Sequence, residues 1–169
     1  MKKGKVCIGY VHNVDVAVTW HDSLMNLRLF DLLKKKRTIN GGGIIAKFSS
    51  ANVSSSRNQL VTTFLDESDA EWLWMVDTDM VFAPNTLEAL LVNANADKDS
   101  EHYAPIVGGL CFAVNDGKLE PTMYQLVKGD DGGMATVRYT TYPKDAMFQV
   151  SATGAACLLI HRSVCEAMR

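Results

Sequence analysis

The chain has 169 residues, which fits one domain, and 47% of them are hydrophobic, which is enough to bury a sizeable core. The formal net charge of -2 gives no global attraction to nucleic acid or to an anionic membrane. No apolar run approaches the length of a transmembrane helix, and the start of the chain does not have the pattern of a signal peptide.

The first part of the chain alternates between short apolar runs and amphipathic stretches. This pattern predicts strands at 5–11, 44–48, 72–76 and 105–114, and helices at 16–36, 57–65 and 84–95. In the first helix, Trp20, Leu24 and Leu27 form the apolar stripe, and Met25, Leu29, Leu32 and Leu33 are expected beside it. The basic run at 34–37 is interpreted as the solvated end of that helix.

From residue 115 onward the spacing changes to short strands separated by turns. Asn115-Asp116-Gly117 is typical of a hairpin turn. Further strands are expected at 121–127, 136–140, 148–150 and 155–160, and a helix begins at His161. The predicted class is therefore α/β: one domain over 1–169, with a mostly parallel, Rossmann-like sheet flanked by helices and an antiparallel hairpin extension.

The four cysteines (Cys7, Cys111, Cys157 and Cys165) form no C-x-x-C pair, so a zinc site is not expected. Three of them lie in apolar, strand-like runs, where a thiol acts as a small core residue. Reduced thiols of this kind predict a cytoplasmic protein.

The most informative stretch is the apolar strand at 72–76, because Asp77 and Asp79 follow it directly. A fully apolar strand is typical of a sheet covered on both faces, and open α/β sheets bind ligands at the carboxyl ends of their strands. Two adjacent carboxylates repel each other unless a positive charge lies between them, and Mg²⁺ or Mn²⁺ suits such oxygen ligands. The alternative is structural, since Asp is also common in turns and helix caps.

A second candidate lies at the start of the helix predicted for 57–65. Ser56 and Gln59 have the spacing of a capping box, which places Arg57 and Asn58 in the first turn beside free backbone N–H groups. That position favours an anion site, and a solvent-exposed arginine is an equally good interpretation.

Four segments taken together resemble a known family: SSSRNQLVTTFL, EWLWMVDTDMVFAPNTLEALL, IVGGLCF and SATGAACLLIHRSV. In this order and spacing the chain is similar to glycosyltransferases of the GT-A fold, in particular to small bacterial and bacteriophage members related to glycosyltransferase family two. The resemblance implies transfer of a sugar from a UDP- or GDP-linked donor to an acceptor hydroxyl on a glycan, protein or lipid-linked molecule, with Mn²⁺ or Mg²⁺ as cofactor.

The resemblance also implies roles for individual residues. Asp79 matches the direct metal ligand of the family's D-x-D motif, and Asp77 matches the residue that faces the ribose and the metal's water shell. Arg57 and Asn58 match an Arg-Asn pair near the nucleotide. The remaining implied contacts are Tyr10 and His12, beside the base, and Gly154, in the loop that lines the acceptor side.

No catalytic base is assigned. In the family, a carboxylate and often a histidine follow the segment that corresponds to 163–169, so the chain is expected to lack part of the catalytic region and to bind the donor without transferring it. Two alternatives remain open. One is a non-catalytic module that binds nucleotide sugars, and the other is a haloacid dehalogenase-like phosphatase in which Asp77 would be the nucleophile.

Overall fold

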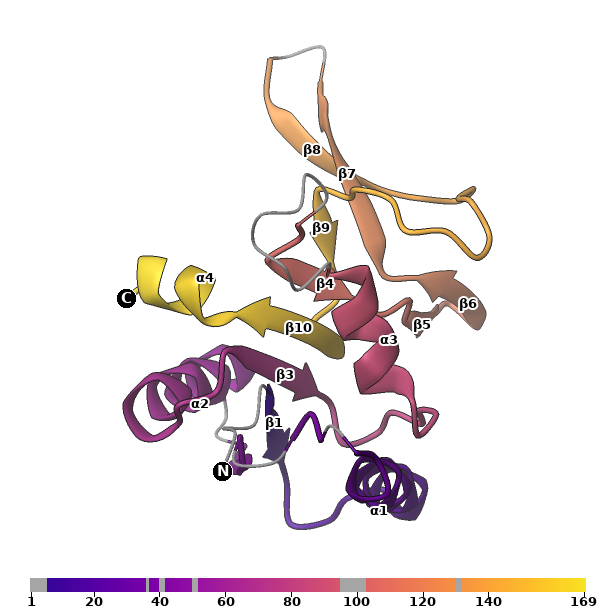
Figure 1. Cartoon of the computed structure of the whole chain (residues 1–169). Helices are drawn as coiled ribbons and strands as arrows, with labels where there is room; N and C mark the ends of the chain where they lie inside the picture. The colour runs from indigo at the N-terminus through magenta and orange to yellow at the C-terminus, as the bar shows by residue number, and fades with distance from the viewer. Residues whose placement is uncertain (1–5, 36, 40–41, 50–51, 95–102, 130–131) are drawn as a thin grey trace.

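The computed structural model describes residues 6–35, 37–39, 42–49, 52–94, 103–129 and 132–169. Figure 1 shows the described elements in chain order: β1 (Val6–His12), α1 (Val18–Leu32), β2 (Ile44–Phe48), α2 (Val53–Glu67), β3 (Trp72–Val76), α3 (Thr86–Asn93), β4 (Ile106–Gly108), β5 (Phe112–Asn115), β6 (Lys118–Pro121), β7 (Met123–Lys128), β8 (Met134–Arg138), β9 (Ala152–Thr153), β10 (Cys157–His161) and α4 (Arg162–Ala167).

The central sheet is open and has five strands in the order β2-β1-β3-β10-β4. Strand β1 is parallel to both of its neighbours, with Ile8 opposite Ile44 in β2 and Trp74 in β3. Strand β10 lies antiparallel between β3 and β4. The predicted α/β class is confirmed, and the sheet is mixed because the last long strand enters it in the opposite direction.

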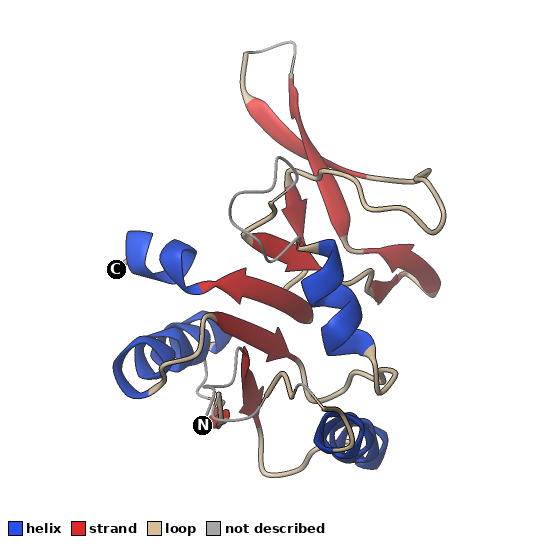
Figure 2. Ribbon diagram, in the orientation of Figure 1, coloured by secondary structure: helices blue, strands red, loops and turns tan. Residues whose placement is uncertain are grey.

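Strand β3 is buried along its whole length, as its apolar run predicts. Its side chains alternate between two hydrophobic clusters. Trp72, Trp74 and Val76 pack in a cluster with residues of α1 and α3, whereas Leu73 and Met75 pack in a cluster with residues of α2 and α4. The sheet is therefore covered by helices on both faces (Figure 2). Because β3 is the middle strand of the five, its carboxyl end lies at the centre of the sheet's edge.

The antiparallel extension consists of the hairpin β5–β6 and a separate sheet with the order β8-β7-β9. Asp116 and Gly117 form the hairpin turn with positive φ angles of 48° and 75°, as the Asn-Asp-Gly sequence predicts. Figure 1 shows the β7–β8 ribbon projecting away from the central sheet.

Several predicted boundaries were wrong. The apolar run at 105–114 is not one strand, because it is divided between β4 in the central sheet and β5 in the hairpin. The segment 148–150 has no regular structure, and the strand in this region is β9. Helix α1 ends at Leu32, so Lys34, Lys35 and Arg37 follow the helix, while Lys36 lies outside the described residues.

The assignment of apolar residues on α1 was also partly wrong. Trp20, Leu24 and Leu27 are buried as expected. The residues expected beside them are instead exposed, namely Met25, Leu29, Leu32 and Leu33. The helix therefore carries a second apolar face that the core does not use.

Candidate functional site

The ends of β1, β3 and β4 and the start of β10 meet at the carboxyl edge of the central sheet. The parallel strands β1 and β3 both end there, at His12 and Val76. Because β10 is antiparallel, its first residue, Cys157, lies at the same edge opposite Val76. The Asp77 backbone N–H donates to the Ala156 carbonyl at 2.9 Å, and the Gly109 N–H donates to the Cys157 carbonyl at 2.9 Å. The edge therefore holds Asp77 between the end of β1 and the start of β10.

Asp77 is held by Arg57 from helix α2. The Arg57 Nη2 atom lies 2.7 Å from Oδ1 and 2.9 Å from Oδ2 of Asp77. Both side chains are about one-third exposed, at 29% for Arg57 and 37% for Asp77, so solvent reaches the pair. The positive charge that the two adjacent aspartates require is thus supplied in part by the chain itself.

The position of Arg57 on its helix differs from the predicted one. Helix α2 begins at Val53, and the Asn52 side chain caps it by accepting from the N–H groups of Ser54 and Ser55. Ser56 is a buried helical residue, so the predicted capping box was wrong. Arg57 and the exposed Asn58 lie in the second turn, where backbone N–H groups are bonded within the helix, and the predicted anion site at the helix start is lost.

Asp79 lies two residues beyond Asp77 and is exposed. The turn that carries it is closed by the Met80 N–H, which donates to the Asp77 carbonyl at 3.3 Å. Across the described ranges, no group of three or more His, Cys, Asp or Glu side chains surrounds one point. Mg²⁺ and Mn²⁺ often use one or two protein carboxylates together with water and phosphate oxygens, and an exposed carboxylate beside a fixed one fits such a cation.

Tyr10 and Arg57 both line a small pocket beside Asp77, whose wall also includes Gly9, Val11, Leu60 and Met75. Tyr10 packs edge-on against Trp20 of α1, with ring centroids 4.7 Å apart. The Tyr10 ring therefore packs with the cluster on the α1 side of the sheet, whereas Leu60 and Met75 belong to the cluster on the α2 side. The structure brings Arg57 and Asp77 together on the α2 side and places the Tyr10 side chain on the other face of the sheet.

His12 lies two residues further along β1, on the same face as Tyr10, and the two ring centroids are 5.9 Å apart. The His12 ring packs against Phe48 with centroids 5.9 Å apart, and its Nδ1 atom lies 2.7 Å from the Asn13 carbonyl oxygen. The strand continues through His12, so the residue predicted in the loop after the first strand is the last residue of β1.

Gly154 lies in the connection between β9 and β10, at the same edge as Asp77. Its N–H donates to the Thr122 carbonyl at 2.8 Å. A Cβ atom built on Gly154 would lie 2.8 Å from Thr122 Oγ1 and 2.9 Å from Thr122 Cβ. The glycine is therefore required for close packing of this connection against the segment between β6 and β7.

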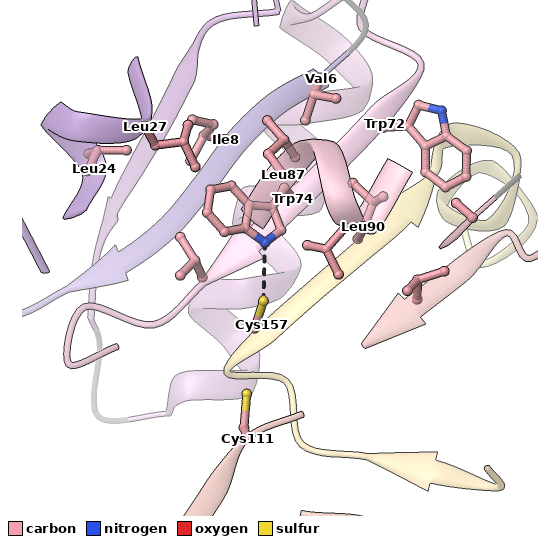
Figure 3. Packing of buried hydrophobic residues seen from close by; sticks show 14 of the residues in the cluster. Val6, Ile8, Leu24, Leu27, Trp72, Trp74, Leu87, Leu90, Cys111 and Cys157 are labelled. Carbon is pink, nitrogen blue, oxygen red and sulfur yellow. Dashed lines mark hydrogen bonds between the residues drawn. The ribbon is translucent and has the colours of Figure 1, made fainter. Parts of the chain in front are cut away.

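Two buried cysteines lie behind the aspartates, and the sequence interpretation assigned them only to the core. Burial raises the pKa of the Cys111 thiol to about 11, and electrostatic interaction with Cys157, Asp77 and Asp79 adds to the rise. Figure 3 shows Trp74 Nε1 donating to Cys157 Sγ, at 3.4 Å. The buried side of the site, formed by Trp74, Cys111 and Cys157, is thus apolar. Its thiols are protonated at neutral pH.

No protein-family model matches the chain, and no curated protein matches it. Among solved structures, the chain is similar to A197 from STIV, a viral protein, with a TM-score of 0.64 and 13% identity. The similarity covers 98% of this chain and 69% of A197. At this level of identity the comparison shows a shared α/β fold. Within the described residues, no helix has the length and apolarity needed to span a bilayer.

Proposed function

We propose that the chain is a metal-dependent glycosyltransferase domain of the GT-A fold that binds a nucleotide-diphosphate sugar, linked to UDP or GDP, for transfer to an acceptor hydroxyl. The observation that carries the proposal is the geometry at the end of β3. Arg57 fixes Asp77 with two short contacts, and the exposed Asp79 follows two residues later. Open α/β sheets bind ligands at this edge.

The two aspartates have different environments and therefore different roles in this proposal. Asp79 is the carboxylate that is free to bind Mn²⁺ or Mg²⁺, and the bound cation would neutralise charge on the donor's diphosphate as it leaves. Asp77 is oriented by Arg57 toward the donor and the cation's water shell. Tyr10, near the carboxyl end of β1, would contact the nucleoside from the α1 side of the sheet.

The rest of the edge serves the acceptor in this proposal. The connection that contains Gly154 also contains Ala156, whose carbonyl accepts from the Asp77 backbone N–H. This hydrogen bond joins the connection to the backbone of Asp77. Four free cysteines, all buried, are consistent with a cytoplasmic protein whose thiols stay reduced.

The phosphatase alternative fits this geometry less well. A nucleophilic aspartate must present an oxygen to phosphorus, whereas both oxygens of Asp77 contact the Arg57 guanidinium. A carboxylate held in this way suits a residue that orients a ligand.

Isothermal titration calorimetry with UDP and GDP, each with and without Mn²⁺, tests the proposal. We expect one of the two nucleotides to bind only when the cation is present. A transfer assay with the corresponding UDP- or GDP-sugars then separates an enzyme from a non-catalytic module, because only the enzyme releases nucleoside diphosphate in the presence of acceptor. Equal binding with and without the cation would contradict the metal-dependent site.

A further inference from the structure

Helix α1 presents a second apolar face to solvent, on the side away from its core residues. Met25, Leu29, Leu32 and Leu33 follow one another at helical spacing, and each is exposed. Leu29 is 57% exposed and Leu33 is 81% exposed. Single exposed leucines are common on protein surfaces, but a continuous stripe on one helix is typical of an interaction surface. Figure 1 shows α1 at the periphery of the molecule.

The same end of the helix is basic. Arg28, Lys35 and Arg37 are exposed, and across the described part of the chain no carboxylate is within ion-pair distance of them. Lys34 differs, because it forms an ion pair with Glu88 and lies over the Phe30 ring. The concentration of positive charge is local, since the whole chain has a net charge of -2.

We propose that this face of α1 binds the surface of an anionic lipid bilayer. The surface comprises the apolar residues Met25, Leu29, Leu32 and Leu33 and the basic residues Arg28, Lys35 and Arg37. Helices that lie in a membrane interface combine an apolar face with lysine and arginine beside it, and the basic residues are attracted to anionic headgroups. The inference concerns a peripheral contact and is independent of the site at Asp77.

Charge favours lipid over a second copy of the chain as the occupant. A symmetric dimer contact centred on Leu29 and Leu33 would bring the basic residues of both copies together near the two-fold axis. Like charges in that position oppose association. An anionic bilayer instead supplies complementary charge and an apolar layer for the leucines.

Sedimentation with vesicles tests the proposal, using phosphatidylcholine alone and a mixture of phosphatidylcholine with 30% phosphatidylglycerol. The natural chain should sediment with the anionic vesicles at low salt, and 0.5 M NaCl should reduce the bound fraction. Replacing Arg28, Lys35 and Arg37 with Gln should lower the partition coefficient by about 100-fold, because each basic residue near an anionic surface contributes roughly a fivefold factor.

A second variant removes the apolar part and keeps the charge. Leu29→Gln, Leu32→Gln and Leu33→Gln together should also abolish sedimentation, while circular dichroism shows the helix retained because these side chains are exposed. The matched control is Val114→Gln with Leu119→Gln, which changes two exposed residues of the β5–β6 hairpin and should leave binding unchanged.

Three results would overturn the proposal. The first is a natural chain that stays in the supernatant with anionic vesicles. The second is equal loss of binding in the hairpin control. The third is a dimer, seen by light scattering, that the leucine variant converts to a monomer, because the face would then belong to a second copy of the chain.

Discussion

The Arg57 guanidinium contacts both carboxylate oxygens of Asp77 through a single nitrogen, at 2.7 Å and 2.9 Å. This contact joins the second turn of α2 to the end of β3, twenty residues further along the chain. It places a positive charge beside the two aspartates, at 77 and 79, that share this edge of the sheet. It also divides their roles, because Asp77 is fixed and Asp79 is left exposed to solvent.

Loss of this contact should affect the site more than the fold. Replacing Arg57 with Ala should lower the free energy of unfolding by about 1 kcal/mol, because the pair is partly exposed and solvent weakens it. Nucleotide affinity should fall further, since the orientation of Asp77 is lost. Arg57→Lys keeps the charge but not the two short contacts, so it should recover the stability and only part of the affinity. Urea unfolding and calorimetry measure the two effects, and full affinity in the Ala variant would contradict the role of Arg57.

Gly154 should be intolerant of a side chain. Gly154→Ala places Cβ within 3 Å of Thr122 Oγ1 and Cβ, so the β9–β10 connection must shift. A cost of about 1–3 kcal/mol is expected from such overpacking, and it should appear in urea unfolding. Gly132→Ala in the β7–β8 connection is the control for backbone strain, because its φ of 79° is unfavourable while no atom lies within 4 Å of the new Cβ. A Gly154→Ala variant as stable as the natural chain would contradict the close packing.

The start of α2 offers a test of the cap. Asn52 accepts from the N–H groups of Ser54 and Ser55 at 3.0 Å and 3.3 Å. Asn52→Ala should therefore destabilise the chain by about 1 kcal/mol. Ser54→Ala, in the first turn and exposed, is the matched control and should change stability by less than about 0.5 kcal/mol. Equal effects of the two substitutions in thermal unfolding would argue against the cap.

The buried thiols predict how stability depends on alkaline pH. Burial raises the pKa of Cys7 and of Cys111 from 9.0 to about 11, and it raises the pKa of Cys157 and of Cys165 as well. Because the folded pKa is higher than the unfolded one, the contribution is fully present below pH 9. Between pH 9 and 11 the unfolded chain loses thiol protons while the folded chain keeps them, and stability falls.

For each thiol the fall should be up to about 1.4 kcal/mol per pH unit in this window. Urea unfolding at pH 8, 9, 10 and 10.5 measures it. Lysines and tyrosines also titrate in this window, so the comparison is with Cys111→Ala. In that variant the free energy of unfolding should fall less steeply with pH, because the contribution of the Cys111 thiol is absent. An unchanged slope would mean that Cys111 ionises equally in both states.

The parts of the fold that the sequence predicted best are those governed by local pattern. The bounds of β2 and β3 agree with the apolar runs, and the β5–β6 turn agrees with Asn-Asp-Gly. The direction of β10 is set by tertiary pairing with β3, and an apolar run carries no sign of it. The division of 105–114 between two sheets has the same origin, since both halves are equally apolar.

The candidate site was predictable in its residues but not in its contacts. The aspartates were identified because they directly follow a buried strand. The Arg57–Asp77 contact depends on where α2 begins, and the helix is capped by Asn52, four residues before the Ser56 cap that the sequence predicted. The exposed face of α1 was missed because leucines at helical spacing fit either a core face or a surface face.

The central claim is that Asp79 binds the cation that holds the nucleotide. Calorimetric titration of UDP and GDP in the presence of Mn²⁺ should show affinity reduced by about 10- to 100-fold in Asp79→Asn, with stability unchanged. Asp116→Asn, which makes the same change of charge in the exposed β5–β6 turn, should bind like the natural chain. If Asp79→Asn binds the nucleotide with Mn²⁺ as tightly as this control does, the account of the site is wrong.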